Sequence, residues 1–156
     1  MNINVIEKDL FTVDDSYYLA HCISADYVLG AGIAVQFNRR FNMRRRLKQV
    51  GTGVWPDCIL VGRVFNLVTK ERAFHKPTYD SLKESLETMR LLAVKNHASK
   101  IAMPLIGCGL DQLEWGKVLQ ILKDVFWYTD IEILVCYLEK DKDLLLSKAK
   151  PASTAI

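Results

Sequence analysis

Two short glycine-containing turns are the part of this chain best suited to bind a ligand. They lie at residues 30–34 (GAGIA) and 106–111 (IGCGLD). Each follows an apolar run typical of a buried strand and leads into a segment with helical spacing. Because glycine has no Cβ, backbone N–H groups at such a turn can approach a ligand closely, and the helix N-terminus adds unpaired donors and a positive dipole. Two such turns predict a clamp that holds a diphosphate from both sides.

The turns match none of the common phosphate-binding motifs. Gly30 and Gly32 occupy two positions of the dinucleotide-binding G-x-G-x-x-G pattern, but Val35 stands at the third. No Gly-Lys-Ser/Thr follows, as a P-loop requires, and the chain has no G-x-S-x-G elbow of a serine hydrolase. If the turns bind no phosphate, they are simply tight connections between a strand and a helix.

The elements around the turns indicate an α/β fold. Runs rich in Val, Ile, Leu and Tyr predict strands at residues 3–6, 18–23, 59–68, 101–105 and 131–138. Most are apolar along their whole length, so we expect helices on both faces of the sheet. Helical spacing predicts helices at residues 32–43, 79–92 and 115–126. The alternation favours a three-layer α/β/α sandwich with a mostly parallel mixed sheet, whose ligands sit beyond the carboxyl ends of the strands.

The length of 156 residues fits a single domain, which we place at residues 1–140. Residues 141–156 lose the alternating pattern, and we expect a C-terminal tail that is poorly ordered at its end. No apolar run is long enough to span a bilayer, and the N-terminus lacks the layout of a signal peptide. We therefore expect a monomer in the cytoplasm, the nucleus or both, with no membrane partner.

The cysteines and the basic residues suggest no further site. Cys22, Cys58, Cys108 and Cys136 are widely spaced without a C-x-x-C pair, which favours free thiols over disulfides or a metal site. Six cations crowd one stretch of the chain: Arg39, Arg40, Arg44, Arg45, Arg46 and Lys48. They could bind a polyanion or serve nuclear targeting, but a solvated helix face followed by a basic loop explains them more simply. A nucleic-acid partner is thus not needed.

Two segments resemble the ligand-binding loops of macrodomains, which bind ADP-ribose. Residues 19–24 (LAHCIS) with the first glycine turn look like the first loop of that superfamily, and residues 103–111 (MPLIGCGLD) look like the second. Within the superfamily the chain is similar to the terminal ADP-ribose protein glycohydrolases, also described as O-acetyl-ADP-ribose deacetylases. The segments that carry this similarity are residues 68–70 (VTK), 75–79 (HKPTY) and 109–111 (GLD) followed by Trp115. The motifs keep their order from residue 3 to residue 138.

The resemblance implies a hydrolase that removes ADP-ribose from glutamate or aspartate side chains of proteins and deacylates O-acyl-ADP-ribose, without a cofactor. ADP-ribosylated proteins would be its partners and ADP-ribose its product. Lys70 would be the nucleophile and Asp111 its acid–base partner. Asp9 would accept a hydrogen bond from the adenine amino group beside the Leu10 amide, although Lys8 stands where the family usually has glycine.

The other ligand-binding positions follow from the same resemblance. Ser24 and the amides of the first turn would hold the diphosphate and the distal ribose, and the amides of the second turn would close over the phosphates. The positions implied in full are His21, Ser24, Gly30, Ala31, Gly32, Ile33, Ala34, Thr69, Pro104, Ile106, Gly107, Cys108, Gly109, Leu110 and Leu138.

The chemistry of the two catalytic candidates fits these roles. A lysine amine attacks a sugar C1 only when it is neutral, whereas the free side chain has a pKa of about 10.4. Burial or nearby cations lower that pKa. Attack by Lys70 on the opened ribose would give a Schiff-base-type adduct and expel the acyl group. A carboxylate must then move protons, and Asp111 is the one acid directly on either glycine turn.

Each candidate also has a structural explanation. Lys70 could be an exposed lysine at a strand end, and Asp111 with Glu114 fits a helix capping box. His21 lies in an apolar strand pattern, which favours a hydrogen-bonded core histidine over a base. Cys108 lacks a partner histidine nearby, so we interpret it as a small residue that fits beside phosphate. The competing functions are a non-catalytic ADP-ribose reader, an ADP-ribose 1″-phosphate phosphatase, and a nucleotide-binding protein outside the superfamily.

Overall fold

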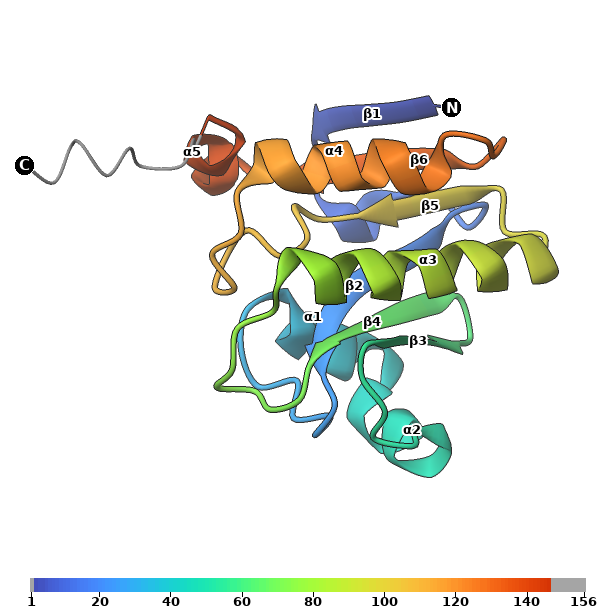
Figure 1. Ribbon diagram of the computed structural model, residues 1–156, viewed down its shortest axis with the longest axis vertical. Coiled ribbons are helices and arrows are strands. Elements are labelled where there is room, and N and C mark those ends of the chain that lie inside the picture. The colour runs from blue at the N-terminus through green and yellow to red at the C-terminus, as the bar shows by residue number, and fades with distance from the viewer. Residues whose placement is uncertain (1, 147–156) are drawn as a thin grey trace, which may run out of the picture.

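A six-stranded mixed sheet organises the chain in the computed structural model, which describes residues 2–146 (Figure 1). The strands are β1 (Asn2–Glu7), β2 (Tyr18–Ser24), β3 (Asp57–Val61), β4 (Val64–Lys70), β5 (Lys100–Met103) and β6 (Glu132–Tyr137). They lie in the order β1-β6-β5-β2-β4-β3, and within the described range β3 alone pairs antiparallel. The predicted sandwich with a mostly parallel sheet is confirmed.

Helices cover both faces of the sheet, as the continuous apolar strands predict. Helices α3 (Tyr79–Lys95) and α4 (Trp115–Phe126) lie on one face, and α1 (Ile33–Phe41) and α2 (Met43–Val50) lie on the other (Figure 1). Strand β4 shows why its sequence is apolar throughout. Phe65 and Leu67 pack towards α3 and α4, whereas Val64 and Val68 pack towards α1 and α2. Every residue from Val64 to Thr69 is buried.

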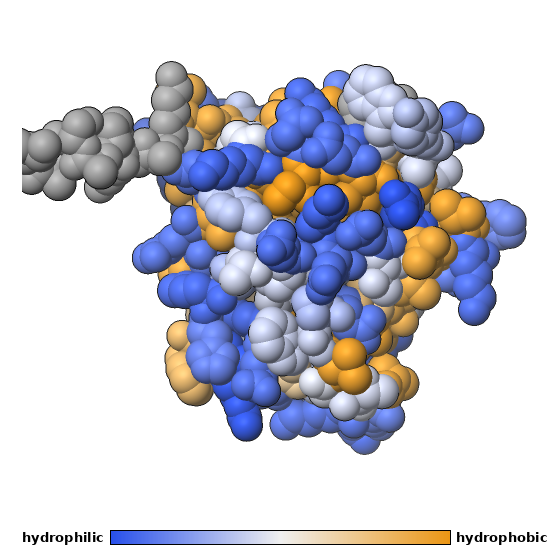
Figure 2. Space-filling view, in the orientation of Figure 1, coloured by the Kyte–Doolittle hydropathy of each residue, from blue (hydrophilic) through white to orange (hydrophobic). Residues whose placement is uncertain are grey.

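The outer surface of α3 and α4 is mostly polar, with apolar surface visible between the helices (Figure 2). This pattern follows from the predicted helices at residues 79–92 and 115–126, whose apolar positions face the sheet. Helix α3 begins with a capping box at Thr78 and Ser81, each of which accepts a hydrogen bond from the backbone N–H of the other. None of the helices within residues 2–146 is long and apolar enough to cross a membrane.

Two predicted elements are wrong in detail. The apolar run 59–68 is not one strand but the hairpin β3–β4, because Gly62 turns the chain with a positive φ of 59°. Gly62 and Arg63 interrupt the apolar run at this point and were the available signal of a turn. The helix predicted at 32–43 ends at Phe41, because Asn42 adopts the left-handed conformation (φ 51°, ψ 43°). The basic loop expected after it is helix α2.

The chain remains regular past the predicted domain boundary at residue 140. A short turn at Glu139–Asp141 leads into helix α5 (Lys142–Leu145). Lys142 forms an ion pair with Glu7 at 3.2 Å, which links this segment to β1, and a second ion pair within the segment with Glu139 at 3.1 Å. The end of the tail, which we expect to be poorly ordered, lies outside the described residues 2–146.

One buried histidine links strands β2 and β4. His21 is fully buried and stacks on Phe37, with ring centroids 3.8 Å apart. Its Nε2 lies 2.6 Å from Oδ1 of Asn66. The Asn66 amide nitrogen donates to the carbonyls of Ile59 and Val64, so Oδ1 is the acceptor and His21 Nε2 carries the proton. The other nitrogen, Nδ1, is buried without a hydrogen-bond partner. The prediction of a hydrogen-bonded core histidine is confirmed.

This environment makes the fold sensitive to mild acid. Burial lowers the pKa of His21 from 6.5 to about 4, and the Asn66 hydrogen bond opposes that shift only in part. Between these two pKa values the unfolded chain binds a proton at His21 and the folded chain does not. The free energy of unfolding therefore falls as the pH drops from 6.5 towards 4. We expect His21 to contribute a loss of about 1 kcal/mol per pH unit in this window.

Urea unfolding at several pH values between 7.5 and 4.5 measures this contribution. A His21→Gln variant should lose less stability than the wild-type protein across the window, whereas His97→Gln, at an exposed histidine, should match the wild-type slope. Equal slopes for wild type and His21→Gln would show that His21 is not the group responsible.

Candidate active site

The two glycine turns lie at the same edge of the sheet, beyond the carboxyl ends of its central strands. Strand β2 leads to the first turn, β5 leads to the second, and these strands are neighbours. Helix α1 begins directly after Gly32, which has a positive φ of 59° and makes no side-chain capping bond. The Val35 amide donates to the Gly32 carbonyl at 3.2 Å. The N–H groups of Ile33 and Ala34, which open the helix, are left for an anionic ligand.

The second turn is compact and faces the first. The Leu113 amide donates to the Gly107 carbonyl at 2.8 Å, and the Gln112 amide donates to the Gly109 carbonyl at 3.1 Å. Leu110 reaches across to the other turn, since a Cβ on Gly32 would lie 3.5 Å from its Cδ1. The structure thus brings together the two turns that the sequence singled out.

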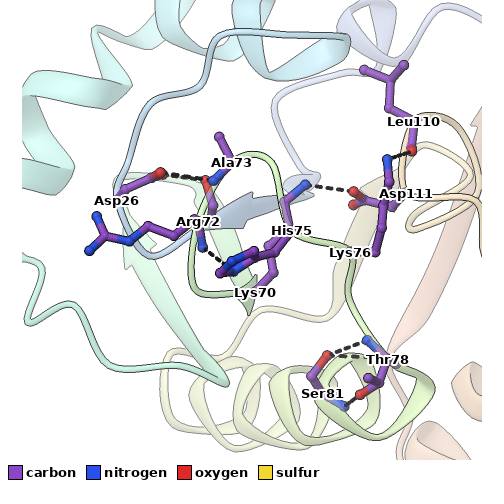
Figure 3. A network of polar contacts seen from close by, with 11 residues as sticks. Asp26, Lys70, Arg72, Ala73, His75, Lys76, Thr78, Ser81, Leu110 and Asp111 are labelled. Carbon is purple, nitrogen blue, oxygen red and sulfur yellow. Dashed lines mark hydrogen bonds and ion pairs between the residues drawn. The ribbon is translucent and has the colours of Figure 1, made fainter.

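An ion pair joins Lys70, at the end of β4, to Asp111, at the end of the second turn (Figure 3). The Lys70 Nζ donates to Asp111 Oδ1 at 2.7 Å. Only 14% of the lysine side chain and 15% of the aspartate side chain are exposed. Lys70 is the last residue of β4, so the rigid sheet sets its position. A nearly buried amine that donates to a carboxylate can pass its proton to that carboxylate and become a nucleophile.

The structural explanations of these two residues are wrong. Lys70 is not an exposed lysine at a strand end, because most of its side chain is buried against Asp111. Asp111 does not cap α4, since that helix begins at Trp115 with Glu114 at its N-cap position and without a side-chain capping bond. The Glu114 amide instead donates to the Tyr79 hydroxyl at 3.0 Å.

Comparisons with known proteins show the family of this chain. No known protein-family profile matches the chain. The chain is 43% identical, over 136 residues, to the ADP-ribose glycohydrolase OARD1 of Homo sapiens and to that of Bos taurus. The match covers 85% of this chain and 90% of each relative. The chain belongs to the macrodomain superfamily, in the group of OARD1. The family that its loops resemble is confirmed.

Solved structures show the same fold at lower identity. The macrodomain of Mycobacterium tuberculosis DarG superposes with a TM-score of 0.76 at 22% identity, covering 87% of this chain and 97% of that chain. A structure of Thermosipho africanus DarTG in complex with ADP-ribose superposes with a TM-score of 0.70 at 17% identity. The superposition covers 98% of this chain and 44% of the DarTG chain.

The positions predicted for an adenine lie together at the far edge of the macrodomain sheet. Asp9 and Leu10 follow β1, and Leu138 follows the neighbouring strand β6. The Asp9 carboxylate accepts a hydrogen bond from the Phe11 amide at 3.0 Å, which caps the turn at Leu10–Thr12. Leu138 is exposed, whereas Leu10 is buried.

Other predicted positions lie behind the turns rather than on them. The His21 ring is fully buried and meets no solvent, so it can affect a ligand only through its neighbours. Thr69 is also fully buried, and its hydroxyl has no hydrogen-bond partner.

Burial raises the pKa of the Cys108 thiol to about 12 and that of Cys22 still further. Both thiols therefore stay protonated, which fits Cys108 as a small residue and not a nucleophile.

Asp26 is a residue of the site that sequence reasoning missed. Its carboxylate accepts hydrogen bonds from Ser24 Oγ, the Ala73 amide and the Val28 amide. Partial burial opposes ionisation of Asp26, but these hydrogen bonds outweigh it and hold the pKa of the carboxyl below its usual value. The Ser-x-Asp spacing from Ser24 was the available signal, because such side chains often bond to nearby backbone.

The basic stretch lies on helices α1 and α2. Arg44 Nε donates to the Val28 carbonyl at 2.7 Å, Arg46 donates to the Phe41 carbonyl at 3.2 Å, and the Arg40 guanidinium stacks 4.3 Å from the Phe11 ring centre. A shallow hollow of about 450 Å³ lies against both helices and is lined by Asn38, Asn42, Arg44, Arg45, Lys48 and Gln49. The expected helix face is confirmed, with several of its cations bound to neutral groups.

A glycine substitution in the second turn tests how tightly this turn is built. At Gly107 (φ 73°) an alanine Cβ would lie 2.9 Å from Leu113 Cδ1, in a conformation that disfavours any side chain. We expect Gly107→Ala to lower the free energy of unfolding by about 1–3 kcal/mol, measured by urea denaturation.

Gly116→Ala is the matched control, since Gly116 lies in α4 and its Cβ would meet nothing within 4 Å. That variant should gain about 0.5–1 kcal/mol from helix propensity. Equal effects of the two substitutions would contradict the geometry of the turn.

Proposed function

We propose that the protein is a hydrolase that releases ADP-ribose from acyl linkages, including glutamate and aspartate esters of modified proteins and O-acyl-ADP-ribose. The observation that carries this proposal is the nearly buried ion pair between Lys70, at the end of β4, and Asp111, in the second glycine turn. The 43% identity to proteins named ADP-ribose glycohydrolase supports the same activity. A protein that only binds ADP-ribose has no need of a lysine–aspartate pair at that position.

The layout of the site suits an elongated dinucleotide. The diphosphate would lie between the uncapped start of α1 and the amides of the second turn. The adenine would lie near Leu138, which follows β6, and near Asp9, which follows β1 at three strand spacings from β2 in the sheet order. That separation is about 14 Å. The distal ribose would then point towards Lys70.

The reaction begins with a proton transfer from Lys70 to Asp111, which leaves a neutral amine. The amine attacks C1″ of the distal ribose, the C1″–O bond to the acyl group breaks, and the carboxylate leaves. The resulting lysine adduct opens to a Schiff base, which water hydrolyses to release ADP-ribose and restore the amine. Asp111 returns its proton and assists the water. All groups required are side chains of the protein, the substrate and water.

Release of ADP-ribose from a glutamate-ADP-ribosylated protein tests this mechanism. We expect Lys70→Ala and Asp111→Ala each to lower turnover by at least about 100-fold, because each removes a group that acts on the reacting bonds. Binding of ADP-ribose, measured by calorimetry, should persist in both variants. Lys95→Ala, at an exposed lysine at the far end of α3, should retain full activity.

The single variants leave one nearly buried charge unpaired, so their folding must be measured alongside activity. We expect each to lose about 1–3 kcal/mol of stability. The double variant Lys70→Met/Asp111→Leu should recover much of that loss while remaining inactive. Wild-type turnover in Lys70→Ala would refute the mechanism. A wild-type protein that binds ADP-ribose and never releases product would instead be a reader.

A further inference from the structure

A single loop forms hydrogen bonds with the segments of both glycine turns. Residues 71–78 join Lys70 at the end of β4 to the start of α3 (Figure 3). On one side, Asp26 accepts a hydrogen bond from the Ala73 amide at 2.9 Å. The Ala25 amide also donates to the Lys70 carbonyl at 2.9 Å. Since residues 24–28 lead into the first glycine turn, these bonds attach the loop to that turn.

On its other side the loop contacts the second turn through Lys76. The Lys76 ammonium donates to the Leu110 carbonyl oxygen, and Figure 3 shows this contact directly beside the Lys70–Asp111 pair. The Leu110 carbonyl carbon is bonded to the nitrogen of Asp111. A hydrogen bond to that oxygen therefore fixes the orientation of the peptide unit from which Asp111 extends.

The backbone of Lys76 is itself well held. Thr78, two residues on, forms the capping box with Ser81 that starts α3. Before it, the His75 amide donates to the Arg72 carbonyl at 3.0 Å, which closes a tight turn. Lys76 thus extends from a short segment between two fixed points. Leu110, by contrast, is 62% exposed, and its side chain is not packed in the core.

We propose that Lys76 is a positioning residue that keeps the Asp111 carboxylate within hydrogen-bond distance of Lys70 by holding the Leu110 carbonyl. This inference rests on the proposed function. The two lysines bind the same turn in different ways, Lys70 at a side chain and Lys76 at the backbone. Proton transfer between Lys70 and Asp111 depends steeply on their separation, so a small shift of the turn lowers the rate of the reaction without removing any reacting group.

Replacement of Lys76 by methionine and by arginine tests the proposal. Methionine keeps the length of the side chain but cannot donate a hydrogen bond, whereas arginine can still donate to a carbonyl. We expect Lys76→Met to lower kcat by between about threefold and tenfold, with an ADP-ribose Kd within about twofold of wild type. Lys76→Arg should restore most of the kcat. Lys95→Met removes an equal charge at the far end of α3 and should change neither quantity.

A second readout is independent of catalysis. The NMR order parameter of the Asp111 backbone N–H, which belongs to the peptide unit held by Lys76, should fall in Lys76→Met and stay unchanged in Lys95→Met. An unchanged order parameter would overturn the proposal even if the wild-type protein proved inactive. With an active wild type, an unchanged kcat would overturn it as well. A raised Kd with unchanged kcat would assign Lys76 to ligand binding instead.

Discussion

The Lys70–Asp111 ion pair is the interaction on which the organisation of this site depends. Its partners are 41 residues apart in sequence, and one ends a strand while the other ends a glycine turn. Both side chains have lost most of their contact with water, which is costly for two charges unless the geometry is good. The surrounding structure must therefore hold strand β4 and the second turn in a fixed relation.

The sheet supplies that fixed relation. Strand β2 pairs with β4 on one side and with β5 on the other, so Lys70 and the second turn lie on opposite sides of the end of β2. Apolar packing on both faces of the sheet makes this frame rigid. The loop after Lys70 adds hydrogen bonds to both glycine turns, through Asp26 and Lys76. Together the frame and the loop orient the Lys70–Asp111 pair in a mostly buried environment.

The fold and the two turns were predictable because their signals are local. Continuous apolar runs mark strands buried on both faces, and a Gly-x-Gly at the end of such a run marks a close backbone approach. The break at Asn42 was missed because helical spacing continues across it. The hairpin was missed although Gly62 and Arg63 interrupt the apolar run between Val61 and Val64, which is a turn signal. The pairing of Lys70 with Asp111 came from resemblance alone, since no spacing in the chain encodes a contact across 41 residues. Lys76 was missed because its partner is a backbone carbonyl 34 residues away. Asp26 has local partners in Ser24 and Val28, but its bond to the Ala73 amide spans 47 residues and has no signal in the sequence.

Reductive trapping of the lysine adduct tests the central claim most directly. Wild-type protein is mixed with an ADP-ribosylated substrate and cyanoborohydride, digested, and analysed by mass spectrometry, with heat-denatured protein as the control for unspecific labelling. The mechanism predicts an ADP-ribose adduct on Lys70 that is absent from the denatured protein and from Lys70→Ala. Turnover without an adduct on Lys70, or labelling spread equally over other lysines, would contradict it.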